Sequence, residues 1–162
     1  MRKRVLSAAL AAIVLAAGCA SVSPDDLKPG ASAEQIRAQM GAPRATYALP
    51  GGGQRLEFRG RGPRTFMLDV DASGRLVAST QVLNTTNFRN IVPGMTREQV
   101  LMTLGQPDEI SRVGRQRDEV WSWHFQNIEC QWFQVSFGSD GRTARGGSTS
   151  LTPACLSAGG GP

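Results

Sequence analysis

The sequence contains few of the residue types from which catalytic and metal sites are built. Its 162 residues include one histidine, His124, and three cysteines. A zinc site needs three or four ligands at compatible spacing, and the residues near His124 do not supply them. A nucleophilic triad would need a serine or cysteine activated by this histidine. We therefore expect no metal, no cofactor and no enzymatic activity, and interpret His124 as a surface or interface residue.

The sequence also lacks an apolar run long enough for a permanent membrane span. Its N-terminal apolar run, Val5 to Ala17, would extend about 20 Å as a helix, which is too short to cross a bilayer comfortably. This stretch follows the basic residues 2–4 and ends in Leu-Ala-Ala-Gly-Cys at residues 15–19. A positive end, a short apolar run, small residues and a cysteine in that order predict a secretory signal peptide over residues 1–18. The pattern resembles the lipobox of bacterial lipoproteins.

The lipobox resemblance implies that Cys19 is acylated, that the chain is cleaved before it, and that its new amino group is acylated as well. Two or more acyl chains hold a protein stably on a membrane, at about 0.8 kcal/mol per buried CH₂ group. Ala20 follows the cysteine, and by analogy with the enteric sorting rule the absence of Asp favours the cell outer membrane, with the protein facing the periplasm. The small, polar residues 19–28 predict a flexible tether. An ordinary signal peptide and an uncleaved anchor remain as alternatives.

Strong charge of one sign is also lacking once the leader is set aside. The formal net charge is +5, but three of the 18 basic residues lie at positions 2–4, which leaves 15 basic and 13 acidic side chains, a charge of +2. We therefore expect no nucleic-acid partner. The glycines at 51–53 lack the Lys and Ser/Thr of a phosphate loop and predict a hairpin connection. Asp69, Asp71 and Asp140 do not have the spacing of an EF-hand loop and are interpreted as turn residues.

The sequence does contain two copies of one motif. Residues 29–43 and 93–107 match at a constant offset of 64, with six of 15 positions identical. Each copy has a capping box followed by the glycine and proline that end a helix. The positions are Ser32, Gln35, Gly41 and Pro43 in the first copy and Thr96, Gln99, Gly105 and Pro107 in the second. Each copy therefore predicts a helix of about eight residues, too short to be stable without packing.

Alternating apolar residues follow each predicted helix and predict antiparallel strands. The positions expected to face the helices are Leu56, Phe58, Phe66, Leu68 and Val70, then Trp121, Trp123, Phe125, Phe133, Val135 and Phe137. Returning strands are predicted over 76–83 and 142–151, and a further helix around 86–91. The predicted fold is α+β: two tandem units, residues 29–83 and 84–152, each with one or two short helices on a three-stranded antiparallel sheet. A C-terminal tail is expected over residues 153–162.

Residues 91–145 resemble the SmpA/OmlA (BamE) family of outer-membrane lipoproteins. The resemblance lies in a Pro-Gly-Met-Thr-x-x-Gln-Val-x-x-x-Leu-Gly-x-Pro motif, a Trp-x-Trp-x-Phe strand and a Ser-Asp-Gly turn. It implies a role in outer-membrane protein assembly or envelope integrity, although the assembly factor is essentially one unit and this chain has two. The tandem arrangement is similar to the β-lactamase-inhibitor protein fold, whose concave sheet grips its target. That similarity implies partner contacts at Trp132, exposed on the open sheet face, and at His124 and Gln134.

Cys130 and Cys155 form an even pair once Cys19 is assigned to lipid. In an oxidising periplasm such a pair predicts a disulfide, with two free buried thiols or an intermolecular bridge as alternatives. These expectations describe a membrane-anchored periplasmic lipoprotein that acts as a protein-binding or scaffold module. It would have a protein partner in the periplasm or outer membrane. A tethered inhibitor or sensor of a periplasmic enzyme is the first alternative, and an enzyme is the second.

Overall fold

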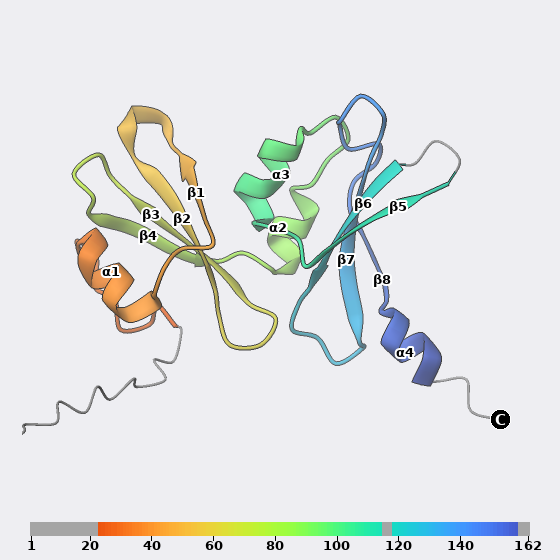
Figure 1. Cartoon of the computed structure of the whole chain (residues 1–162), viewed down its shortest axis with the longest axis horizontal. Helices are drawn as coiled ribbons and strands as arrows, with labels where there is room; N and C mark the ends of the chain where they lie inside the picture. The colour runs from red at the N-terminus through yellow and green to blue at the C-terminus, as the bar shows by residue number, and fades with distance from the viewer. Residues whose placement is uncertain (1–22, 115–117, 159–162) are drawn as a thin grey trace, which may run out of the picture.

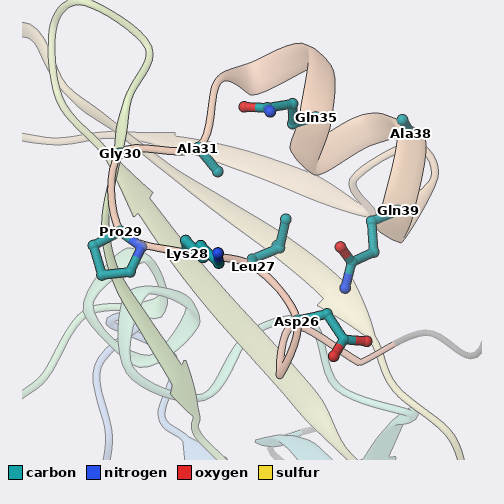
Figure 2. A pocket seen from close by; sticks show the side chains of 9 residues that line it. All are labelled: Asp26, Leu27, Lys28, Pro29, Gly30, Ala31, Gln35, Ala38 and Gln39. Atoms are coloured by element: carbon teal, nitrogen blue, oxygen red, sulfur yellow. The ribbon is translucent and has the colours of Figure 1, made fainter.

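The computed structural model describes residues 23–114 and 118–158, which form two tandem α+β units (Figure 1). The expected signal peptide and Cys19 lie outside the described residues. The first unit contains α1 (Ala33–Met40), β1 (Ala45–Ala48), the 3₁₀ turn η1 (Pro50–Gly52), β2 (Gln54–Arg59), β3 (Thr65–Val70) and β4 (Leu76–Gln81). The second contains α2 (Thr85–Arg89), α3 (Arg97–Leu104), β5 (Glu109–Val113), β6 (Asp118–His124), β7 (Gln131–Phe137), β8 (Ser148–Leu151) and α4 (Pro153–Ala158).

The helices of the repeated motif form as the sequence predicts. Both α1 and α3 have eight residues and begin with a complete capping box. In α3, the Thr96 hydroxyl accepts from the Gln99 N–H at 3.3 Å, and the Gln99 side chain accepts from the Thr96 N–H at 2.8 Å. The helices end at Gly41 and Gly105, where φ is +80° and +79°. Glycine takes these backbone angles without the steric cost that a Cβ would add.

Each unit has its own apolar core between its helices and one face of its sheet. All the predicted strand positions of the first unit lie in one core cluster, together with Ile36 and Met40 of α1. The second core contains the predicted tryptophans, phenylalanines and Val135, with Phe125 packed against it. Its rings contact one another closely, as shown by the stacked pair Phe88–Phe133 with centroids 4.1 Å apart. The prediction of which strand residues face the helices is confirmed.

The prediction of three strands per sheet is wrong, because each sheet has four. The strand orders are β1-β2-β3-β4 and β5-β6-β7-β8, and all neighbours are antiparallel. The omitted strands, β1 and β5, lie at sheet edges and contain no fully buried residue. An edge strand with little burial carries only a weak alternation of apolar and polar residues, and this explains the omission.

Three local expectations also need correction. Asp69 lies on β3 and pairs with Arg55, whereas Asp71 and Asp140 are turn residues as predicted. The described part of the expected tether, residues 23–28, packs on the first unit: Pro24 is buried and Leu27 contacts the first core. The expected tail begins with helix α4, which has proline in its first turn, a position that suits it.

The elements are stacked in layers along the molecule (Figure 1). Helix α1 covers one side of the first sheet, α2 and α3 lie between the two sheets, and the second sheet follows, with α4 beyond the end of β8. In residues 23–114 and 118–158, no helix is sufficiently long and apolar to cross a membrane. Each sheet has one face on its own core and a second face opposite it. The second face of the first sheet is turned to the second unit, whereas the second face of the second sheet is turned away from the first unit.

Candidate functional site: the open face of the second sheet

At the junction between the units, the face of the first sheet that is opposite its core binds the end of helix α3. Leu56 and Phe58 of β2 lie in the first core, and Glu57 between them points to the second unit. The Glu57 side chain is 0% exposed, and both of its oxygens lie within 3.1 Å of the Gln106 N–H, which donates to them. A buried carboxylate requires such partners, because an uncompensated charge is costly away from water.

Two further groups of the first unit complete the surroundings of Glu57. The Tyr47 hydroxyl donates to its carboxylate at 2.6 Å, and the Arg44 guanidinium lies 3.6 Å away. Burial and the adjacent carboxylate raise the pKa of Tyr47, so the phenol stays protonated and continues to donate. A Cβ at Gly105 would lie 2.9 Å from the Glu57 carboxyl carbon. Glycine is therefore needed at this helix end for its backbone angle and also for the close approach of the sheet.

Arginines of the first unit bind the carbonyl groups at the end of α3. Arg55, held by two hydrogen bonds to Asp69 at 2.7 and 2.8 Å, donates to the Met102 carbonyl at 2.7 Å. Arg44 donates to the Gln106 carbonyl at 3.2 Å and to the Pro107 carbonyl at 2.9 Å. The last carbonyls of a helix lack intrahelical partners and favour positive charge. The second face of the first sheet is therefore a docking face for a helix and the turn that follows it.

The register of the two sheets identifies the equivalent face in the second unit. Glu57 pairs with Ala45 and Met67, and Ser122 pairs with Glu109 and Gln134 in the same way. The open face is defined here by Ser122 and the residues that share its side of the sheet, since paired residues lie on one face. These are Glu109, Ser111, Val113, Asp118, Val120, Ser122, His124, Trp132, Gln134, Ser136, Ser148 and Ser150. Six of these side chains, including His124 and Ser136, are exposed.

A hydrogen-bond network orders the centre of the open face. The Gln134 amide donates to the Ser122 hydroxyl at 3.0 Å and accepts from the Ser150 hydroxyl at 2.7 Å. The Trp132 indole N–H donates to Ser150 at 2.8 Å. The network therefore joins β6, β7 and β8 and fixes these side chains before any partner arrives. Such preorganisation lowers the entropic cost of binding.

Trp132 lies on the predicted face, but its expected exposure is not found. Its side chain is 8% exposed. The ring lies beside His124, at a centroid separation of 5.7 Å, and its N–H is held by Ser150. The indole is thus a flat part of the surface and does not project from it. The exposed member of the pair is His124, at 47%.

His124 also links the open face to the junction. Its backbone N–H donates to Asp108 at 2.7 Å, and its ring Nδ1 lies 3.3 Å from the same carboxylate oxygen. Arg59 of the first unit pairs with Asp108. In the described ranges, no group of three or more His, Cys, Asp or Glu residues is placed to hold a metal ion. The arrangement offers hydroxyl, amide, imidazole and indole groups suited to noncovalent contact.

Some residues of this site were not identified from the sequence. Ser122 lies between two predicted inward tryptophans, so the alternation of β6 already placed it on the open face. The alternation of single strands could not identify the other residues of the site. Strand register brings Ser150 to it, and packing between the units brings Asp108 together with Arg59. The predicted pair Cys130 and Cys155 forms a disulfide with Cα atoms 6.4 Å apart. It ties the start of β7 to α4 and thereby supports the strand that carries Trp132 and Gln134.

Comparison with known proteins gives no family for this chain: no family model and no curated protein matches it. Several solved structures are similar at low identity, among them the following three. A candidate β-lactamase inhibitor protein from Streptococcus mutans has 15% identity and a TM-score of 0.33 over 81% of this chain and 89% of that one. A cysteine-rich secretory protein from Staphylococcus aureus subsp. aureus Mu50 has 11% identity and a TM-score of 0.30, covering 79% of this chain and 46% of that one.

The third similar structure is an extracellular protein containing an SCP domain from Bacillus anthracis str. Ames. It has 11% identity and a TM-score of 0.33, covering 96% of this chain and 51% of that one. The chain thus spans about half the length of this protein and of the staphylococcal one. With TM-scores this low, the three similarities support no inference about the function of this chain.

Proposed function

We propose that this protein is a non-catalytic, membrane-tethered module that binds an α-helix of a partner protein on the open face of its second sheet. Lipid on Cys19 would hold it at the outer membrane, facing the periplasm. One observation carries the binding proposal: the same face of the first sheet already binds a helix end, that of α3, through Glu57 and Arg55. The fold thus uses this face for docking. In the second unit six side chains around the face are exposed, whereas Val120, Ser122 and Trp132 at its centre are largely covered by their neighbours.

The chemistry of the open face indicates which helix it would accept. Where the first sheet has Arg55, Glu57 and Asp69, the second has Val120, Ser122 and Ser136 by register. The charges that hold the end of α3 are thus replaced by one apolar and two small hydroxyl side chains. We infer that the partner helix presents small and apolar side chains to Val120 and Trp132, with amide or hydroxyl groups near the serines.

The layered structure places this face far from the proposed anchor. Residues 23–31 and α1 lie at one end of the stack, and the open face lies at the other (Figure 1). Packed layers are about 10 Å apart. The body would therefore present its binding face roughly 30 Å from the tethered end. Attachment to one membrane leaflet raises the local concentration of the module, so a weak contact is sufficiently occupied. Outer-membrane protein assembly and envelope integrity are processes in which such a recruiter would act.

Site-specific photocrosslinking in living cells tests the binding proposal. A benzoylphenylalanine placed at His124 or at Ser136 should form an adduct with a protein, and mass spectrometry should locate the crosslink in a helix of that protein. The same group at Ser139, an exposed turn position next to the end of β7, is the matched control. Equal adducts from Ser139 would contradict the proposal, as would an adduct that contains only a second copy of this chain. If the adduct contains an enzyme whose turnover this protein suppresses, the module is an inhibitor.

The tether is tested separately. Cys19→Ser should block acylation and the cleavage that follows it, so the variant should keep residues 1–18 and have a correspondingly larger mass, and mass spectrometry of the wild type should find acyl chains on the Cys19 sulfur. An unmodified Cys19 with the leader still attached would disprove the anchor. Purified Cys19→Ser protein should still bind the partner identified above, because the open face is unchanged. Failure of the anchor and failure of the binding face are therefore distinguishable.

A further inference from the structure

The second sheet has an edge with free backbone groups at β8. In the order β5-β6-β7-β8, this strand has a neighbour on one side only within the described ranges. The Thr152 N–H donates to the Cys130 carbonyl at 3.0 Å. Because inward and outward groups alternate along an antiparallel strand, the N–H and C=O of Thr149 and Leu151 point away from β7. An extended chain can pair with these groups.

A hollow of about 510 Å³ lies next to this edge, between α2 and β8. Phe88, Ile91 and Phe133 provide an apolar lining, and each is nearly fully buried. Hydroxyl groups and one cation stand around them, from Thr85, Arg89, Ser148 and Thr149. An apolar lining with a few polar groups around it is typical of a binding site, and the volume is more than sufficient for one large side chain.

Two glycines account for the hollow. A Cβ at Gly147 would lie 1.9 Å from the Phe133 ring, and a Cβ at Gly146 would lie 3.0 Å from the Ile91 carbonyl. The chain therefore approaches the core at these positions without contributing side chains of its own. The strand that follows has only four residues, compared with six in β4 of the first unit. Space next to α2 is left unfilled where a longer strand with side chains would occupy it.

The register places the hollow where a side chain of an added strand would lie. Thr149 pairs with Phe133, so its side chain is on the helix side of the sheet. A residue opposite Thr149 on an added strand would point to the same side, directly beyond the edge. Residues two positions apart on a strand share a face. Arg89 lines the hollow together with Thr149, is exposed, and has no carboxylate partner within the described residues, so it is available to the next side chain on that face.

We propose that the edge of β8 binds an extended peptide segment of a partner protein as an added antiparallel strand. A large apolar side chain of the segment enters the hollow lined by Phe88, Ile91 and Phe133. A carboxylate two residues away pairs with Arg89. The main-chain bonds to Thr149 and Leu151 provide affinity, and the hollow and the arginine provide selectivity. This surface is on the helix side of the sheet and meets the open face only at Ser148, on the sheet edge.

Fluorescence anisotropy with a synthetic peptide tests the proposal on the full chain purified in detergent. The probe is a labelled Ser-Thr-Phe-Thr-Glu-Ser peptide with blocked ends, titrated up to about 1 mM protein. Binding should saturate, and replacing its Phe by Ala should weaken binding about tenfold or more. Replacing its Glu by Gln should weaken binding by a smaller factor, because ion pairs at the surface contribute little. No saturation, or equal binding of the Ala peptide, would overturn the proposal.

Substitutions at Thr149 separate backbone pairing from other contacts. Thr149→Pro removes the outward N–H and is compatible with an edge strand, whereas Thr149→Ala keeps that N–H and is the matched control. The Pro variant should bind about tenfold more weakly than the Ala variant. Equal binding by the two folded variants would overturn the added strand.

If Thr149→Pro does not fold, a charge exchange between Arg89 and the peptide tests the binding mode instead. Arg89→Glu should weaken binding of the Glu peptide and restore binding to a peptide with Lys in place of Glu. A lack of restoration would overturn the role of Arg89. Sedimentation of the wild type is the last check: a dimer that the peptide cannot displace would show that a second copy occupies this edge, which would also overturn the proposal.

Discussion

The same face has different chemistry in the two sheets of this molecule. In the first sheet it carries the ion pair Arg55–Asp69 and the buried Glu57, and it is covered by the end of α3. In the second sheet the same register positions hold Val120, Ser136 and Ser122. The first face thus holds a fixed internal partner through charged groups at its centre, whereas the centre of the second face is neutral and largely hydroxyl, with Glu109 and Asp118 at the strand ends. In a duplicated fold, one copy of a docking face can hold the two units together while the other copy stays uncovered by either unit.

The sharpest test of this comparison is Glu57→Ala. It would leave the Gln106 N–H, the Tyr47 hydroxyl and Arg44 without their shared acceptor. We expect a loss of about 4 kcal/mol in the free energy of unfolding, because removing one member of a buried charged cluster leaves the others unsatisfied.

The matched control for Glu57 is Ser122→Ala on the second sheet, which should cost about 1 kcal/mol. Urea denaturation followed by tryptophan fluorescence measures both losses. Similar losses in the two variants would contradict the claim that only the first face is part of the internal structure.

The disulfide should stabilise the second unit and leave the first unchanged. Cys130→Ala combined with Cys155→Ala opens a link between residues 25 apart in sequence, and we expect a loss of about 3 kcal/mol from greater entropy of the unfolded chain. Amide hydrogen exchange should show lower protection in β6 and β7, with β2 and β3 unaffected. Reduction of the wild-type protein is the control and should reproduce this pattern. A uniform loss across both sheets would mean that the units unfold together.

The two motif glycines provide a matched pair. Gly41→Ala should cost about 2 kcal/mol, because a φ of 80° with a ψ of −158° is a backbone conformation that is essentially restricted to glycine. Gly105→Ala should cost about 2 kcal/mol more, because its Cβ would also contact the Glu57 carboxyl carbon, whereas nothing lies within 4 Å of a Cβ at Gly41. Thermal unfolding of the two variants measures the difference. Equal losses would show that the junction adapts to the added methyl group.

The smallest effect concerns pH. Burial raises the pKa of Glu119, but hydrogen bonds from Trp121 and Arg97 outweigh it, and the pKa is lowered from its usual 4.5. The carboxylate therefore binds its proton less readily in the folded state than in the unfolded state. Its stabilising contribution is complete above that value and is lost as the pH falls through the lowered pKa.

Glu119→Gln gives the second unit the residue that Gln54 provides at the equivalent position of the first. It should cost about 1 kcal/mol at pH 7 and progressively less in acid. Free energies of unfolding at a series of pH values measure this, with Glu34→Gln, an exposed change on α1, as the control. A loss that does not change with pH would contradict the role of the charge.

Local sequence patterns predicted the parts of the fold that depend on neighbours in the chain. The capping boxes at Ser32 and Thr96 and the glycines at 41 and 105 place both repeated helices, since these interactions span only a few residues. Strong alternation likewise placed the buried strands and assigned Trp121 and Trp132 to opposite faces. The weakly patterned edge strands β1 and β5 could not be found in this way, because pairing with a buried neighbour is what makes them strands.

The candidate surfaces were predictable to different degrees. Strand alternation was sufficient to place His124 and Gln134 on the open face, but their bonds to Asp108 and Ser150 connect strands that only the register brings together. The hollow at β8 had no sequence signal beyond the glycines at 146 and 147. Its lining includes Phe88 and Phe133, residues 45 positions apart whose rings meet only after the unit has folded.

The sequence by itself determined the duplication, the helix boundaries and the inward face of each sheet, and it predicts a lipobox ending in Cys19. Each of these follows from residue types at short, fixed spacings. Only the tertiary structure decided that Glu57 would meet the end of α3 while Ser122 would remain on an outer face. The physical reason is that the energy of a buried charge depends on groups brought from distant parts of the chain, and no local pattern encodes that encounter.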